Sequence, residues 1–391
     1  MTTELEHPLP PGMRDLLPEE AASRRAIARA VLACFELHGY RLVTPPAFEF
    51  ASVIERGLGT LDQADVLRFV EPESGEVAVL RPDMTPQIAR IVATRLGDHP
   101  RPFRLAYEGT VVRRRLGRAK KHRQIPQVGV ELCGLGGSEG DLELLALAAD
   151  SMRAAGLEDF TIDIADAGIV RALLTGVDAD LTEEIMQALA RKDEAMLAEL
   201  ASRIGGTGGR VSSLARLHGD RNALVEASKL LAGTPAEEPV KRLLAFYDAA
   251  VARGIGGNLR ADAGEVRGFA YYTGLIFSIY ATGPGERIGA GGRYDDLLAK
   301  FGANMPAIGF GVDIDALASA LRAAGKRVVP DSGVVVIGAP DSLLGSLRAK
   351  GISCVAASDR AEAEAYARSW GFAKVVDVTE ATRMLNAVAK E

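Results

Sequence analysis

The sequence predicts an α+β protein, in which an antiparallel sheet packs with helices and a small α/β domain follows at the C-terminal end. Two apolar runs of strand length, 103–107 and 128–132, flank a long basic segment and predict a hairpin. Beyond residue 331, short apolar runs alternate with helical stretches, which is typical of an α/β unit. At 391 residues, the chain has room for two or three domains.

The N-terminal elements follow from helix and turn signals. Pro18 suits a first helical position, and apolar residues recur at helical spacing until Gly39, which ends the helix. A short strand over 40–43 comes next. The runs 66–70 and 77–80 predict a strand pair around a Pro-Glu-Ser-Gly turn, and the following segment leads into a helix.

The rest of the chain divides by composition. Residues 170–259 are rich in Ala and Leu with interspersed charge, which predicts an inserted helical subdomain. Strand signals return at 275–280 and 308–312, and a helix follows the second of these strands. We therefore predict four segments: a first core part over 1–170, a helical insertion over 171–259, a second core part over 260–325 and a small α/β domain over 332–391.

Composition excludes several classes of protein. Apolar residues make up 48% and charged residues 25% of the chain, which is an ordinary globular mixture. No apolar run reaches the roughly 18–20 residues of a membrane helix, and no secretory signal is visible, so we expect a cytoplasmic protein. Three scattered cysteines without CxxC spacing argue against a disulfide framework and against a metal site.

The charge is unevenly distributed. Residues 101–124 hold nine Lys or Arg and one acid, Glu108, for a local charge of +8, so the remainder of the chain carries −14. Such a run is either a solvated loop or an anion site for phosphates. The predicted flanking strands favour the anion site, because they would hold the basic residues at the end of a hairpin.

Common catalytic signatures are missing from the sequence. It contains no GxxxxGK[ST] phosphate loop, no GxGxxG dinucleotide fingerprint, no HExxH and no GxSxG. We therefore expect no catalytic residues of these kinds, no cofactor and no metal.

Five spaced segments together resemble histidyl-tRNA synthetase, a class II aminoacyl-tRNA synthetase. They are PGMRD at 11–15, LRPDMT at 80–85, the hairpin segment 103–134, RGFAYY at 267–272 and GGRYD at 291–295. They occur in the family's order over most of residues 8–320. The resemblance implies a class II synthetase-like fold.

The resemblance also implies a pocket for free histidine, which offers an ammonium, a carboxylate and an imidazole. By resemblance, each of these groups meets its own set of side chains, and two tyrosines line the cavity. Asp83, Thr85 and Gln127 would hold the ammonium, Glu131 and Tyr272 would reach the imidazole, Arg267 would face the carboxylate, Arg113 would lie near an anion, and Tyr271 and Tyr294 would line the pocket.

Departures from the synthetase pattern fall mainly on the ATP half of the site. The family's third motif ends in an arginine that grips the triphosphate, whereas this chain has Ala316 there, with Asp313 in place of a preceding glycine. Arg115 stands where the synthetases carry a glutamate that accepts from adenine. Ala270 replaces the Asp of RGLDYY, and Asp83 is one methylene shorter than the family's glutamate. We therefore predict that aminoacylation is lost.

This combination resembles the ATP phosphoribosyltransferase regulatory subunits, which are synthetase paralogues of histidine biosynthesis. The resemblance implies a partner, the short-form catalytic subunit, and L-histidine as the feedback effector. Histidine could bind in the pocket described above or at the interface with the catalytic subunit, and we expect the pocket. Class II cores dimerise through the first motif, here about 21–44, so a homodimer within a hetero-oligomer is expected. Two alternatives remain: an active histidyl-tRNA synthetase, and a non-catalytic paralogue that binds RNA through the +8 segment. The net charge of −6 and a C-terminal piece of only about 60 residues weigh against tRNA as a partner.

Overall fold

The computed structural model describes residues 9–58, 66–114, 122–266, 272–326 and 333–388. The chain is divided into two compact units. The first comprises Met1–Arg14 and Ile27–Lys326, and the second comprises Asp15–Ala26 and Arg327–Glu391. Helix α1 (Pro18–Leu37) begins at Pro18, as the sequence predicts, and its residues are shared between the units. None of the described helices is long and apolar enough to cross a membrane.

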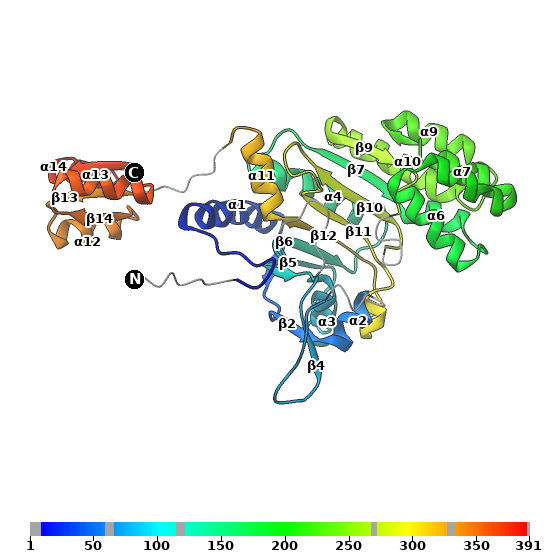
Figure 1. Ribbon diagram of the computed structural model, residues 1–391, viewed down its shortest axis with the longest axis horizontal. Helices are drawn as coiled ribbons and strands as arrows, with labels where there is room; N and C mark the ends of the chain where they lie inside the picture. Colours follow the sequence, from blue (N-terminus) through cyan, green and yellow to red (C-terminus); the bar gives the residue numbers. More distant parts are fainter. Residues whose placement is uncertain (1–8, 59–65, 115–121, 267–271, 327–332, 389–391) are drawn as a thin grey trace, which may run out of the picture. The chain divides into compact units, whose positions relative to one another are not determined.

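A nine-stranded sheet forms the centre of the first unit (Figure 1). Its strand order is β1-β5-β6-β12-β11-β10-β7-β9-β8. The middle of the sheet is antiparallel as predicted, but the β1–β5 and β7–β9 pairs are parallel, so the sheet is mixed. The strands are β1 (Arg41–Val43), β5 (Phe103–Val112), β6 (Gln124–Cys133), β7 (Thr161–Asp166), β8 (His218–Gly219), β9 (Leu259–Asp262), β10 (Leu275–Tyr280), β11 (Gly289–Arg293) and β12 (Ala307–Asp313).

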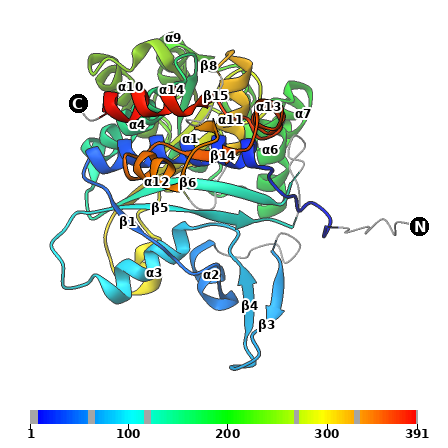
Figure 2. The ribbon, with the colours of Figure 1, turned by 90° about the vertical axis from the view of Figure 1, so that its left-hand side faces the viewer.

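The predicted hairpin is present as β5 and β6. The two strands pair antiparallel over their full length, from Phe103↔Cys133 to Val112↔Gln124. Each strand is longer than its apolar run: β5 continues through residues 108–112, and β6 begins with residues 124–127, of which only Ile125 is buried. Helices α4 (Gly137–Ala154) and α11 (Ile314–Ala323) lie over one face of this hairpin, and α3 (Thr85–Arg95) lies on the other face (Figure 2).

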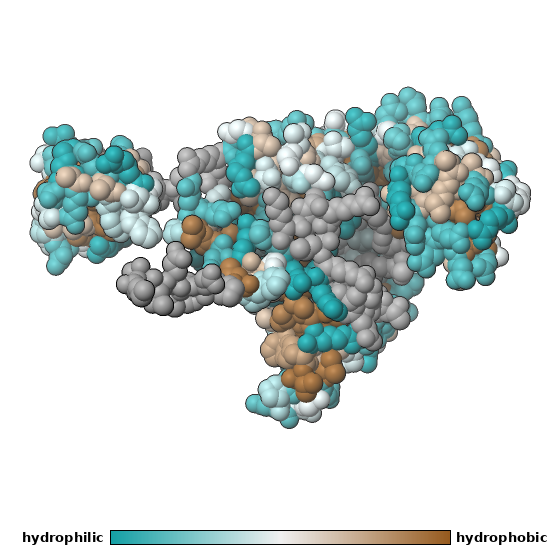
Figure 3. Space-filling view, in the orientation of Figure 1, coloured by the Kyte–Doolittle hydropathy of each residue, from teal (hydrophilic) through white to brown (hydrophobic). Residues whose placement is uncertain are grey.

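A separate three-stranded sheet, ordered β2-β4-β3, lies beside α2 (Ala51–Leu58). It consists of β2 (Phe48–Phe50), β3 (Arg68–Val70) and β4 (Val77–Leu80). The β3–β4 pair was predicted, whereas β2 and α2 were not. Phe48, Phe50 and Phe69 remain 37–45% exposed, and apolar side chains gather over this small sheet in Figure 3.

The stretch predicted to be helical holds the helices α5 to α10. Several of them begin at an aspartate whose carboxylate accepts a backbone N–H, as Asp178, Asp193 and Asp220 do. The sequence did not reveal β8 and β9, which join the edge of the large sheet. The helices are α5 (Ala167–Leu173), α6 (Ala179–Arg191), α7 (Glu194–Arg203), α8 (Gly208–Leu214), α9 (Arg221–Leu230) and α10 (Glu237–Ala252).

The C-terminal part of the second unit is an α/β fold. Its parallel sheet has the order β14-β13-β15 and a core of small and branched residues such as Val334, Val336 and Leu347. The elements are β13 (Val334–Ile337), α12 (Asp341–Ala349), β14 (Cys354–Ala357), α13 (Arg360–Trp370), β15 (Lys374–Asp377) and α14 (Val378–Val388). The strand–helix alternation of the sequence predicts this fold, while the exact limits of the four segments stay a prediction.

Candidate functional site

A cavity of about 330 Å³ opens at the middle of the large sheet. Its walls come from the β5–β6 hairpin, from β11 and β12, and from the turn that precedes α3. Most of the residues predicted for the histidine pocket line it: Asp83, Thr85, Arg113, Gln127, Tyr272 and Tyr294. Arg267 and Tyr271 lie outside the described residues.

Glu131 is buried just behind this lining. Glu131 is 2% exposed, and its Oε1 accepts a 2.6 Å hydrogen bond from the Thr85 hydroxyl. Gln127 and Glu131 stand four residues apart on β6, so their side chains point to the same face of the sheet. The strand register therefore directs both groups toward the cavity.

Glycines of the neighbouring strand make room for Glu131. Gly309 on β12 lies directly opposite Glu131 in the register. A Cβ at Gly309 would lie 1.9 Å from Glu131 Oε2 and 2.5 Å from the Tyr294 hydroxyl oxygen. No side chain fits there, so the glycine lets two polar groups converge on one point of the cavity floor.

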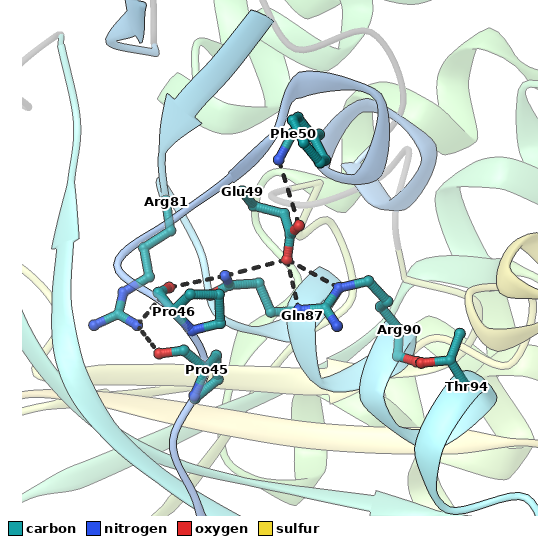
Figure 4. A network of polar contacts seen from close by, with 8 residues as sticks. All are labelled: Pro45, Pro46, Glu49, Phe50, Arg81, Gln87, Arg90 and Thr94. Carbon is teal, nitrogen blue, oxygen red and sulfur yellow. Dashed lines mark hydrogen bonds and ion pairs between the residues drawn. The ribbon is translucent and has the colours of Figure 1, made fainter. Parts of the chain in front are cut away.

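The turn before α3 is held by a polar network (Figure 4). Gln87 Nε2 donates to the Pro46 carbonyl at 3.0 Å, and Arg90 Nη2 donates to Glu49 at 2.6 Å. The buried Arg81 guanidinium donates to the carbonyls of Pro45 at 2.9 Å and of Pro46 at 3.1 Å. These contacts fix the start of α3, and with it Thr85, against the loop that follows β1.

The floor of the cavity is rich in hydrogen-bond acceptors. Glu131 Oε2 and Gln127 Oε1 are buried and have no hydrogen-bond partner among the described residues. Burial raises the pKa of the Glu131 carboxyl well above its usual range; the hydrogen bond from Thr85 opposes this shift, and the charge of Asp83 adds to it. A ligand whose N–H groups face these atoms would satisfy Gln127 Oε1 and would favour the ionised form of Glu131, whose Oε2 is then an acceptor.

Sequence reasoning missed several lining residues. Tyr107, 3% exposed, stands two residues after Leu105 on β5 and therefore shares its face of the sheet, a signal that strand periodicity could have provided. Arg287 and Glu286 come from the turn before β11 and match no motif. Their place in the cavity depends on how β11 pairs with β12.

The residues expected at the lost phosphate grip have definite roles. Asp313 lines the cavity and also caps α11, since its Oδ1 accepts from the backbone N–H of Asp315 at 2.9 Å and of Ala316 at 3.2 Å. Asp315 pairs with Arg14 at 2.9 Å. Of the two acids expected to add negative charge here, Asp315 is thus compensated by an ion pair, while Asp313 faces the cavity.

A family model described as histidyl-tRNA synthetase matches residues 12–317. An Anaeromyxobacter sp. protein is 41% identical over 83% of this chain and 95% of its own length, and a Moorella thermoacetica protein is 37% identical over 96% and 94%. Both are named ATP phosphoribosyltransferase regulatory subunit. The chain belongs to this family.

Solved structures agree with this assignment. The structure of an ATP phosphoribosyltransferase regulatory subunit/histidyl-tRNA synthetase from Bacillus halodurans superposes with a TM-score of 0.82 and 28% identity, covering 95% of this chain and 98% of that one. Histidyl-tRNA synthetase from a Nostoc species, at 20% identity, has the same fold with a TM-score of 0.76, covering 94% of this chain and 90% of that one. The predicted family and the class II synthetase-like fold are confirmed for this regulatory-subunit family member.

Proposed function

We propose that this chain is a non-catalytic regulatory subunit that assembles with the short-form ATP phosphoribosyltransferase and binds L-histidine in the cavity above Glu131. The observation that carries the proposal is the acceptor-rich floor, where buried Glu131 Oε2 and Gln127 Oε1 await donors. Histidine supplies N–H groups on both its imidazole and its ammonium. In the complex, Asp83, Thr85 and Gln127 hold the ammonium, and Glu131 and Tyr272 reach the imidazole.

The wall toward α11 supports the absence of aminoacylation. A triphosphate needs cationic or N–H donors that can follow its charge. At the start of α11, Ala316 offers no side-chain donor, and the carboxylate of Asp313 already accepts the two N–H groups that could face an anion. A phosphate entering here would meet the negative charge of Asp313 and two N–H groups that this carboxylate already engages.

Histidine binding becomes regulation if it favours one arrangement of the assembled complex. The effect on the catalytic subunit is then set by the difference in histidine affinity between the two arrangements, typically about 1–3 kcal/mol. We propose that the chain acts as a homodimer inside a cytoplasmic hetero-oligomer. Its pocket senses the amino acid without consuming it.

Reconstitution with the short catalytic subunit tests the proposal. The mixture should form phosphoribosyl-ATP, with neither chain active alone, and histidine should inhibit it. A parallel ATP–pyrophosphate exchange assay with histidine should stay at background. Clear exchange would establish an active synthetase instead, and a steeply salt-dependent affinity for tRNA would favour the RNA-binding alternative.

A further inference from the structure

Arg287 lines the cavity from the turn that joins β10 to β11. The backbone position of Arg287 is defined by the next residue, Ile288, which is hydrogen-bonded to the strands on both sides of it. Ile288 N–H donates to the Ile279 carbonyl at 2.7 Å, and the Ile288 carbonyl accepts from Asp313 N–H at 2.8 Å. The Ile288 side chain is fully buried. The turn therefore holds the Arg287 Cα at a fixed point of the rim.

The charge of Arg287 is not neutralised by a contact within the described part of the chain. No described residue forms a hydrogen bond or an ion pair with it, although Glu286 is its neighbour in the sequence. The charge of Arg287 acts on Tyr272 in the cavity. Burial raises the pKa of the Tyr272 hydroxyl, and the positive charge of Arg287 opposes that shift. Arg287 is thus an exposed cation that lines the same cavity as Tyr272.

A second cation approaches from another hairpin. Arg113 follows β5 and lines the same cavity, and its Nε donates to the Pro82 carbonyl at 3.2 Å. This contact orients the guanidinium and leaves its terminal nitrogens without a partner among the described residues. The charge of Arg113 also acts on the Tyr272 hydroxyl. Arg113 and Arg287 therefore come from separate hairpins and both act near Tyr272.

The cavity therefore offers both acceptors and cations to a ligand. Glu131 Oε2 and Gln127 Oε1 are buried acceptors without a partner among the described residues, and Arg113 and Arg287 line the cavity from two hairpins. A ligand that carries both N–H donors and a carboxylate matches these groups, and guanidinium pairs with carboxylates by strong, charge-assisted hydrogen bonds.

We infer that Arg287, together with Arg113, binds the ligand's α-carboxylate and makes this pocket select an amino acid over the same imidazole compound without a carboxylate. This inference rests on the proposed histidine-binding function. Arg287 is then a specificity-determining residue that no motif of the sequence reveals.

Calorimetry with the full chain tests the inference, using L-histidine and L-histidinol, the amino alcohol with the same imidazole and amine. Arg287→Ala should weaken histidine binding about 10–100-fold, the effect of losing a charge-assisted hydrogen bond, and should leave histidinol affinity within about twofold. Arg287→Lys, which keeps the positive charge, should keep part of the preference for histidine over histidinol. Arg322→Ala, which removes an exposed arginine of α11 that does not line the cavity, is the matched control and should leave histidine binding unchanged.

Two results would overturn the inference. An equal loss of affinity for both ligands would mean that Arg287 does not read the carboxylate, and unchanged histidine affinity in Arg287→Ala would mean that it makes no contact. Failure of the wild-type chain to bind histidine would instead contradict the proposed function itself. Unfolding curves for each variant check that the exposed turn still folds.

Discussion

The Thr85 hydroxyl donates a 2.6 Å hydrogen bond to Glu131 Oε1, joining the first residue of α3 to the C-terminal half of β6 across 46 positions of sequence. This contact satisfies one oxygen of a buried carboxyl and aims the other at the cavity floor. The geometry of the floor therefore depends on where α3 begins.

Replacing Thr85 tests this dependence. Thr85→Ala should leave Glu131 Oε1 without a donor, which costs about 1–3 kcal/mol and lets the carboxyl rotate away from the ligand. We expect roughly tenfold weaker histidine binding by calorimetry and a lower melting temperature. Thr85→Ser, which keeps the hydroxyl, should behave like the wild type. Equal behaviour of the Ala and Ser variants would refute the role of this hydrogen bond.

The raised pKa of Glu131 predicts a pH dependence of stability. An unfolded glutamate titrates at its ordinary value of 4.5, whereas burial keeps the folded carboxyl protonated to higher pH. Between these values the folded state holds more protons, so the free energy of unfolding falls as pH rises. The stabilisation is complete below pH 4.5 and is lost as pH passes the folded pKa.

The matched variant is Glu131→Gln, which keeps the shape but does not titrate. Urea unfolding of both proteins from pH 5 to 8 should show that the wild type loses stability relative to the variant as pH rises. Parallel curves over the whole range would contradict a protonated Glu131.

Gly309 should be essential to the floor. In Gly309→Ala, the new Cβ would lie only 1.9 Å from Glu131 Oε2, which is closer than two non-bonded atoms can approach. The carboxyl must therefore move, and histidine binding should be lost. Gly311→Ala is the control on the same strand, because its Cβ would lie 3.1 Å from the Tyr107 hydroxyl oxygen and needs only a small adjustment. Calorimetry and thermal unfolding of both variants make the comparison. Full histidine affinity in Gly309→Ala would show that the floor is not used.

Asp313 should contribute to stability as the cap of α11. Asp313→Ala removes the acceptor for the N–H groups of Asp315 and Ala316, at a cost of about 0.5–2 kcal/mol. Asp313→Ser keeps a capping oxygen and removes the charge, so most of the stability should return. Denaturant unfolding distinguishes the two variants, and identical losses would mean that the charge, not the cap, stabilises the protein.

Local patterns predicted much of the fold. Helical spacing and Pro18 predict α1, and alternating apolar runs predict β5, β6 and β10. The sequence did not predict short elements such as β2 and β8, because two or three residues carry too little periodicity to distinguish a strand from a loop. The resemblance to histidyl-tRNA synthetase predicted most of the site residues that line the cavity, but it did not predict Tyr107 or Arg287.

By itself, the sequence determined the family, the synthetase-like fold and the loss of the arginine at Ala316, because motif spacing and side-chain periodicity are local properties of the chain. Only the tertiary structure decided that Gly309 lies against Glu131, that Arg14 neutralises Asp315 and that Arg287 reaches the pocket. These relationships depend on strand register and on contacts between distant residues. A shift of one residue in the pairing of β6 with β12 would turn every side chain on the shifted strand to the other face.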